Sequence, residues 1–403
     1  MSDTESTKIK ILNAAFALYG QNLGRKISLS SIAKTVGISK TAIYRHFESK
    51  EALEQEMHDI FYNDVCDFLY SIQHKTDENP EYDMLSDIII YLCGKRNEIF
   101  YFMSTVPDFN SSDLYLRFKN KGIRFLDDAF NPDGSVKDAY LYNRALFIGA
   151  SMLVFIVCRF KVMECAPDRV KDSAFFAQSL VNLLKCGLRL DAQSITLTQM
   201  SLIDEKCRKS VADIPEVPRI LQAIAAVIKQ DGLPNVTVES VANQLGMAKS
   251  SLYCWFDNKA EMLHTLAKDE MCQLGKIILQ NISEEDNIVK KVYAMMETIL
   301  LYFIKHRQCF PVFKWMQLQH LADGESSSFG AGMNAKFSNF FSKIDFFKDF
   351  DLGISIKDSA LIDSWIFSIP VILITSSWMN DYSEAVMQAS LKDIFFMLIK
   401  GIC

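Results

Sequence analysis

Basic, hydroxyl and aromatic side chains gather in residues 39–50, directly after a glycine at position 37. A lysine or arginine at such a site pairs with phosphate or with the edge of guanine, and a tyrosine hydroxyl donates to phosphate. The polar residues follow the spacing of one helical face, whereas Ile43 and Phe47 fall on the opposite face. This pattern indicates binding to the phosphates and base edges of nucleic acid.

Each polar residue of this segment has an expected role on duplex DNA. The residues expected to face the major groove are Lys40, Thr41, Arg45 and His46. Tyr44 and Lys50 are expected to contact phosphates, which positions the protein without specifying sequence. The capped amide ends of helices that start at Ser28 and Ser39 offer further anion sites.

The elements that must position these residues are four helices. Apolar spacing predicts a first amphipathic helix with inward residues Ile9, Leu12, Ala15, Phe16 and Tyr19. Ser28 caps a second, short helix, and Gly37 suits the left-handed residue that closes it. Ser39 caps a third helix from Lys40 to His46, and Ser49 caps a fourth that runs from Lys50 towards Ser71. The second and third helices form a helix-turn-helix supported by the first.

The segment occurs twice in the chain. Residues 11–53 align without a gap onto residues 220–262 at a constant offset of 209, and matched positions include Gly37 with Gly246 and Tyr44 with Tyr253. The ends of the two halves also resemble each other, since Leu183-Leu184-Lys185-Cys186-Gly187 is similar to Leu398-Ile399-Lys400-Gly401. The 403 residues therefore divide into two units of nearly equal length.

The second copy is less suited to DNA than the first. Residues 8–50 carry eight Lys and Arg against one acid, whereas residues 217–259 carry four against three. Ala248 replaces the capping Ser39, and Cys254-Trp255 replaces Arg45-His46. We expect the two copies to bind different half-sites of an asymmetric or pseudo-palindromic operator, or the second copy to have become a protein contact. Its candidate DNA-binding residues are Thr237, Lys249, Ser250, Ser251, Tyr253, Trp255 and Lys259.

These residues carry a family resemblance. Residues 37–53, GISKTAIYRHFESKEAL, resemble the DNA-binding signature of the TetR family, and residues 246–259, GMAKSSLYCWFDNK, resemble a more diverged copy. The resemblance implies an all-α subunit with a small DNA-binding head and a larger helical body for effector binding and dimerisation. Because ordinary members are homodimers on palindromic operators, it also implies a dimer made covalent, with the units related by a pseudo-two-fold axis. The expected partners are a double-stranded DNA operator and a small apolar or amphipathic effector.

The expected organisation is head, body, linker, head and body. Head 1 is assigned to residues 1–53, body 1 to 54–190, a linker with helical spacing to 191–217, head 2 to 218–262 and body 2 to 263–403. Such a chain satisfies its dimer interface internally, so a monomeric pseudo-dimer is expected, with further dimerisation left open.

Aromatic residues and methionines are abundant in both bodies. The candidates for an apolar effector pocket are Phe100, Phe102, Met103, Phe313, Trp315 and Met316, and ordinary helical core is the alternative for each of them. The apolar runs 145–158 and 365–379, together with residues 174–188 and 384–399, are expected to form a four-helix bundle between the units, or to be buried within each unit.

Composition limits the other classes of function. Sixteen glycines and nine prolines are too few for an all-β fold, and both apolar runs are shorter than the ~20 residues that cross a bilayer. The polar N-terminus predicts a cytoplasmic protein, and ten scattered cysteines without a C-x-x-C pair predict neither a metal site nor a cofactor. No enzyme motif appears in the sequence. The interpretations are an effector-responsive regulator, expected to repress, or a helical ligand-binding or protein-interaction module whose heads no longer bind DNA.

Overall fold

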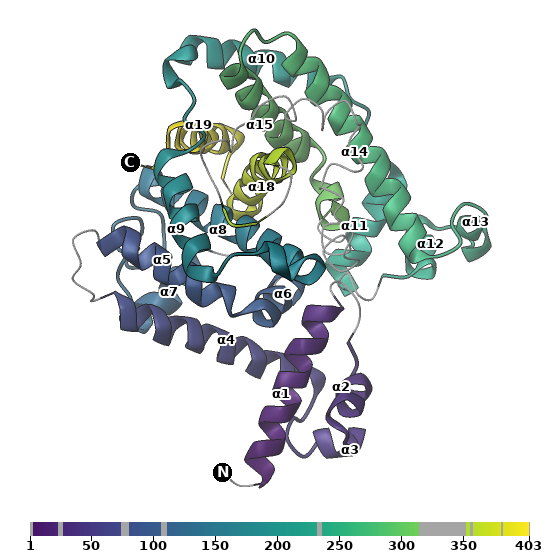
Figure 1. Cartoon of the computed structure of the whole chain (residues 1–403). Helices are drawn as coiled ribbons and strands as arrows, with labels where there is room; N and C mark the ends of the chain where they lie inside the picture. The colour runs from purple at the N-terminus through teal and green to yellow at the C-terminus, as the bar shows by residue number, and fades with distance from the viewer. Residues whose placement is uncertain are drawn as a thin grey trace.

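The computed structural model describes residues 3–22, 27–73, 80–105, 111–231, 236–313, 352–354, 358–379 and 382–402. Over these ranges the secondary structure is helical, and the only β-pairings are two isolated bridges, Phe130 with Val136 and Val170 with Ile354. The all-α fold class predicted from the sequence is confirmed. Figure 1 shows the helices of both units around a shared centre, with one helix-turn-helix projecting from each unit.

The first unit begins with its helix-turn-helix and ends in two long apolar helices. Its helices are α1 Asp3–Gln21, α2 Leu29–Val36, α3 Lys40–Ile43, α4 Lys50–Ile72, α5 Pro80–Cys93, α6 Arg96–Thr105, α7 Ser111–Asn120, α8 Ala139–Cys165 and α9 Ser173–Cys186.

The second unit repeats this order. After α10 Leu197–Ala212 come α11 Arg219–Asp231, α12 Val238–Leu245, α13 Lys249–Tyr253, α14 Lys259–Ser283, α15 Ile288–Lys305, the 3-10 turn η4 Arg307–Cys309, α18 Asp358–Met379 and α19 Glu384–Lys400.

The helices of the first head agree with the prediction from the sequence, except in where α3 ends and in which residues α1 buries. The Ser28, Ser39 and Ser49 side chains each accept a hydrogen bond from a backbone amide of the following turn, and Gly37 is left-handed at φ 80°. Helix α3 ends at Ile43 rather than at His46, because the chain leaves the helix in a turn. Ile9, which the apolar spacing placed on the inward face, is exposed, whereas Ile11 is buried.

Four helices join the units at the centre of the molecule. Helices α8 and α9 of the first unit pack against α18 and α19 of the second, so the predicted bundle between the units is confirmed. The contact is also polar, because Trp365 Nε1 donates to Ser151 Oγ at 2.8 Å and Asn143 Nδ2 donates to Asp393 Oδ2 at 2.9 Å. These bonds cross from one unit to the other inside the core, which joins the two halves into one folded body.

The ends of the two units meet in a reciprocal contact. The Leu188 amide donates to the Leu398 carbonyl at 2.8 Å, and the Ile402 amide donates to the Leu184 carbonyl at 3.1 Å. Each acceptor lies three residues before a glycine with positive φ, Gly187 or Gly401, and each donor lies one residue after it. Each unit therefore gives the other the same bond, as an isologous two-fold contact requires.

The segment expected to be a linker, residues 191–217, contains a packed helix. Met200, Ile203 and Cys207 of α10 are buried against α14 and α15 of the second unit. Leu197 is exposed, although its helical spacing predicts that it lies on the same face as these three residues. Because α10 adds an apolar face to the second body, it forms part of that body's packing.

One described helix, α8, is long and apolar enough to cross a membrane. Its span, Ala139–Glu164, has a mean hydropathy of 2.0 in its most apolar stretch, and 56% of that stretch is buried by the rest of the protein. The helix extends beyond the apolar run 145–158, which by itself is shorter than a membrane span. A single helix of this kind is weak evidence for a membrane segment, because buried core helices have the same composition.

Candidate nucleic-acid interface

The exposed face of the first helix-turn-helix consists of the predicted polar residues. Lys40, Thr41, Tyr44 and Arg45 are exposed and His46 is half-buried. The apolar residues of the same segment, Ile43 and Phe47, are buried in the core of the head. Helix α3 lies near the lower end of the molecule in Figure 1, below α2 and beside α1. Its polar side chains are therefore free to meet a large ligand such as a duplex.

Two of the candidate cations have neighbours within the head. The Lys40 ammonium lies 6.0 Å from the centre of the Tyr44 ring, which holds both groups on one face. The Lys50 ammonium lies 3.1 Å from Glu54 on its own helix, and Glu54 also accepts a hydrogen bond from the Tyr19 hydroxyl. Lys50 is thus directed toward an acid of its own helix, whereas Lys40 and Arg45 point outward.

The second helix-turn-helix has the same backbone geometry. Thr237 caps α12 through its side chain, and Gly246 closes that helix in the left-handed conformation at φ 68°. Ala248 gives α13 no side-chain cap, as its residue type predicts. The local fold therefore tolerates loss of the cap, and the geometry needed for a groove-binding helix is present in both units.

The charge on the second recognition face is partly neutralised. The Lys249 ammonium lies 2.9 Å from the Glu239 carboxylate, and both side chains are exposed. In the first head, the position that matches Glu239 is Ser30, so Lys40 has no acid at that place. An ammonium paired with a carboxylate attracts phosphate less than a lone ammonium does. The ion pair with Glu239 therefore neutralises part of the small positive charge of the second head.

Aromatic groups dominate the rest of the second face. Trp255 is 72% exposed and Tyr253 is 44% exposed, with Ser250 also exposed and Ser251 half-buried. Lys259, the counterpart of Lys50, is half-buried, and its partial burial lowers the pKa of its ammonium. This surface resembles a protein contact more than a phosphate contact, because large exposed aromatic side chains favour protein interfaces.

The two heads also differ in how they join the bodies. The buried residues of the first head form a cluster of their own, which includes Phe16, Ile32 and Phe47. In contrast, the buried residues of the second head, among them Leu221 and Val241, are continuous with the main core of the molecule. The first head is thus a separately packed part of the structure, and the second head is an extension of the core.

Tyr101 connects the first head to its body. This fully buried residue of α6 packs edge-on against Phe16 and Tyr19 of α1, with ring centres 5.2 Å apart in both pairs. Its hydroxyl donates to the Glu54 carbonyl at 2.8 Å. Any displacement of α6 must therefore move the side chains that support α1 and α4. Sequence reasoning missed Tyr101 as a connecting residue, although it is adjacent to the pocket candidates on α6.

The pocket candidates occupy different environments. Phe100 is fully buried against Phe160, and Phe313 is buried against Phe303. Phe102 and Met103 are half-buried, and Phe102 packs on the rings of Phe61 and Tyr62. Trp315 and Met316 lie outside the described residues. Phe100 and Phe313 thus belong to the packed core, which leaves Phe102 and Met103 as the partly accessible members of the set.

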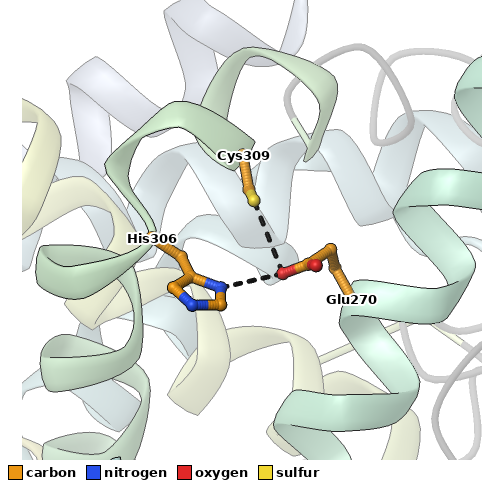
Figure 2. Close-up of side chains that lie close together, drawn as sticks. All are labelled: Glu270, His306 and Cys309. Atoms are coloured by element: carbon orange, nitrogen blue, oxygen red, sulfur yellow. Dashed lines mark hydrogen bonds and ion pairs between the residues drawn. The ribbon is translucent and has the colours of Figure 1, made fainter. Parts of the chain in front are cut away.

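A cluster of three ionisable side chains lies where the second head joins its body. Figure 2 shows Glu270 of α14 facing His306, which directly follows α15, and Cys309 of η4. Glu270 Oε2 lies 2.9 Å from His306 Nδ1 and 3.4 Å from Cys309 Sγ, and it accepts a hydrogen bond from the Tyr302 hydroxyl at 2.6 Å. His306 Nε2 lies 3.0 Å from the Pro215 carbonyl oxygen. All three side chains drawn in Figure 2 are buried.

The electrostatics of this cluster favour an ionised carboxylate. Burial by itself raises the pKa of Glu270, but hydrogen bonds from His306 and Tyr302 outweigh burial and lower it. Burial and the neighbouring carboxylate raise the pKa of the Cys309 thiol. Sequence reasoning missed the cluster because Glu270 is 36 residues from His306; the only local signal is the H-x-x-C spacing of residues 306–309.

Comparison with known proteins identifies the repeated segment. The profile of the family "Bacterial regulatory proteins, tetR family" matches residues 11–57 and again residues 220–266. One similar protein is the "Fatty acid metabolism regulator protein" of Bacillus subtilis (strain 168), which is 30% identical over 78 residues. That match spans 19% of this chain and 40% of the relative's length. Together with the two helix-turn-helix heads, these matches show that the chain belongs to the tetR family of bacterial regulatory proteins and carries two tetR-like units in tandem.

Proposed function

We propose that this chain is an effector-responsive transcriptional repressor that binds double-stranded DNA through two unequal heads. The observation that carries the proposal is the exposed face of the first head, where Lys40, Thr41, Tyr44 and Arg45 stand together on a capped helix-turn-helix. Family membership supports a DNA-binding regulator rather than an enzyme.

The heads are expected to contribute unequally to affinity and sequence recognition. Head 1 supplies most of the phosphate contacts, because its face is cationic and Lys249 of head 2 is paired with Glu239. Arg45 is expected to contact guanine by two hydrogen bonds, which Cys254 cannot form. The preferred operator is therefore asymmetric, with a well-defined half-site for head 1 and a weak or different half-site for head 2.

The proposed effector is a small apolar or amphipathic molecule bound in the first body beside α6. Half-buried Phe102 and Met103 are on this helix, and neighbouring Tyr101 contacts the first head. Two heads in successive major grooves must be about 34–36 Å apart, so a small rotation of head 1 breaks the match. A hundredfold loss of DNA affinity needs about 2.7 kcal/mol of differential effector binding, which a small ligand can supply.

The units complete each other's dimer interface, so the chain is proposed to act as a monomeric pseudo-dimer. The reciprocal bonds of Leu188 and Ile402 and the buried contacts between α8 and α18 support this arrangement. Association of two chains would place four heads in one complex, which sedimentation at micromolar protein distinguishes from a single chain.

A selection of bound sequences from random duplex DNA, with the full-length chain, tests the proposal. Recovery of two unlike half-sites at a fixed spacing supports DNA binding by two unequal heads. An enriched site that the Arg45→Ala variant no longer enriches supports it as well. Recovery of a perfect palindrome with equal arms contradicts the asymmetric operator. In follow-up binding measurements, Lys50→Ala weakens affinity on all sequences alike, whereas Arg45→Ala also relaxes sequence preference.

A second candidate function concerns head 2 alone. The exposed Trp255, Tyr253 and Met247 form an apolar surface on its recognition side, which favours a protein-interaction role for this head. Enrichment of a single half-site in the selection, unchanged by Trp255→Ala, supports that role. No enrichment at low salt would favour an interaction module in which neither head binds DNA.

A further inference from the structure

We propose that Glu270, His306 and Cys309 form a binding site for a divalent transition-metal ion of the Zn²⁺ or Co²⁺ kind. Their candidate ligand atoms all lie within 4.8 Å of one another, and all three residues are buried. A carboxylate, an imidazole and a thiolate together match the mixed ligand sets of zinc sites. The thiolate disfavours Mg²⁺ and Ca²⁺, which prefer oxygen ligands.

The distances are close to those that coordination requires. Bonds of about 2.0–2.3 Å in a tetrahedral site place neighbouring ligand atoms roughly 3.3–3.7 Å apart. The Cys309 Sγ to Glu270 Oε2 distance of 3.4 Å lies in this range, and the His306 Nδ1 to Glu270 Oε2 distance of 2.9 Å is slightly shorter. Coordination therefore requires the His306 ring and the carboxylate to separate by about half an ångström, and requires Nδ1 and Cys309 Sγ, which lie within 4.8 Å of each other, to take up the same tetrahedral spacing. The fourth position is left for water or for the Tyr302 hydroxyl.

The outer contact of His306 is of the kind that metal-binding histidines make. Its Nε2 lies 3.0 Å from the Pro215 carbonyl oxygen, which can only accept a hydrogen bond. This contact assigns a proton to Nε2 and directs Nδ1 at Glu270 and Cys309. Histidine ligands commonly donate their second ring N–H to a backbone carbonyl in this way, which fixes the ring orientation.

Metal binding at this site also balances charge. Without metal, an ionised Glu270 faces a His306 ring whose two nitrogens both point at acceptors, and Cys309 donates as a neutral thiol. When M²⁺ binds, the proton shared between His306 Nδ1 and Glu270 Oε2 leaves, and so does the proton of the Cys309 thiol, both to solvent. The thiolate and the carboxylate then neutralise the two positive charges of the ion. The buried site is thus neutral overall before and after the exchange, and no oxidation or reduction takes place.

The site is specific to the second unit and lies at its head. At an offset of 209 the first unit has Phe61, Asn97 and Phe100 at the positions of Glu270, His306 and Cys309, which cannot form this ligand set. Turn η4, which contains Cys309, packs against α11, the first helix of head 2. A bound ion would therefore join α14 and the end of α15 to the segment that enters head 2.

Cobalt titration of the full-length, reduced chain tests the site, with absorbance as the readout. Co²⁺ should bind one to one and produce a thiolate-to-metal charge-transfer band, and Zn²⁺ should abolish that band by competition. Cys309→Ser should remove the band, and Glu270→Gln should weaken Co²⁺ binding by at least tenfold. Cys254→Ser removes an exposed thiol in head 2 and serves as the matched control, so its titration should equal that of the unchanged chain.

Thermal unfolding of each variant without metal shows whether it folds, so that a lost band is not attributed to a misfolded protein. For the unchanged chain, Zn²⁺ should raise the Tm, and the Cys309→Ser variant should lose this rise. Absence of a charge-transfer band in the folded, reduced chain overturns the proposal. A band that persists in folded Cys309→Ser, or that disappears in Cys254→Ser, also overturns it. Each of these three outcomes would mean that Glu270, His306 and Cys309 form a hydrogen-bonded network and bind no metal ion.

Discussion

The two heads have the same helix-turn-helix backbone but differ in charge, capping and attachment. The first presents Arg45 and Lys40 from a separately packed head and has Ser30 at the place of Glu239, whereas the second pairs Lys249 with Glu239 and presents Trp255. The core of the second head is also continuous with the main core of the protein. A tandem repeat thus preserves the residues that determine local backbone geometry, while the residues that face a ligand diverge.

This difference separates two roles that identical heads would share. A head with its own core can move on a limited set of contacts such as those of Tyr101 with α1, whereas a head whose core is continuous with the main core moves less freely. We infer that regulation acts mainly through head 1, with head 2 as the fixed reference.

The largest effect concerns the second body, where Glu297 occupies the position of Ile88 in the first. Burial, and then the charge of Asp204, raise the pKa of Glu297 from 4.5 to about 8, although the hydrogen bond from Gln388 and the charges of Lys392 and Arg208 oppose the shift. Between these pH values the unfolded chain ionises and the folded chain does not, so the free energy of unfolding falls as pH rises. The shift corresponds to about 5 kcal/mol across that window.

Glu297→Gln removes this titration and should flatten the pH dependence of stability from pH 5 to pH 8. Urea unfolding of both proteins at several pH values measures the slope. Ile88→Val in the first body is the matched control and should leave the slope as it is. An equal slope in the Gln variant and in the unchanged chain would show that Glu297 is not its source.

The next effect concerns the attachment of head 1. Tyr101→Ala should destabilise this head by about 3–5 kcal/mol, because it leaves a cavity between α1 and α6. Phe310, at the matching place in the second unit, is only partly buried, so Phe310→Ala should cost less. Hydrogen exchange of the α1 and α11 amides compares the two heads directly. Equal protection losses in both heads would contradict the difference in attachment.

Base recognition should depend on one head. Arg45→Ala is expected to cost about 1–3 kcal/mol of DNA affinity, since one bidentate base contact is lost. Cys254→Ala at the matching position should change affinity less than about twofold, because a thiol makes no such contact. Fluorescence anisotropy on the selected operator measures both variants, and a large loss in Cys254→Ala would mean that the heads share recognition.

The residues that precede α3 and α13, Ser39 and Ala248, can be exchanged between the heads. Ser39→Ala should destabilise head 1 by about 1 kcal/mol, because its side chain accepts from the Ala42 amide. Ala248→Ser should stabilise head 2 by up to about the same amount, since α13 has no side-chain cap. Thermal unfolding in the absence of DNA compares the two variants. Stabilisation by both, or by neither, would indicate that capping does not distinguish the heads.

The smallest effect is electrostatic. Glu239→Ser should free Lys249 and make the salt dependence of DNA binding steeper by about one ion, whereas Ser30→Glu should make it shallower by a similar amount. Anisotropy titrations between low and moderate salt give both slopes. Identical slopes for Glu239→Ser and the unchanged chain would place Lys249 away from the DNA.

Much of the fold and of the first head could be predicted from the sequence, because the signals are local. Serine caps, a left-handed glycine and apolar spacing act within one or two helical turns, so Ser28, Gly37 and Ser39 have the predicted conformations. The end of α3 was less predictable, since a turn at Tyr44 replaces a continued helix. The apolar runs also predicted the bundle between the units, because helices without a polar face must be buried on all sides.

The sequence by itself determined the helical class, the duplication and the polar face of the first head, because each follows from periodicity or from residues close together in the chain. Only the tertiary structure decided which distant residues meet. The reciprocal contact at Gly187 and Gly401, the Tyr101 connection and the Glu270–His306–Cys309 cluster all join residues far apart in sequence. Such contacts depend on the relative placement of whole helices, which is set by packing of the entire core and not by local propensity.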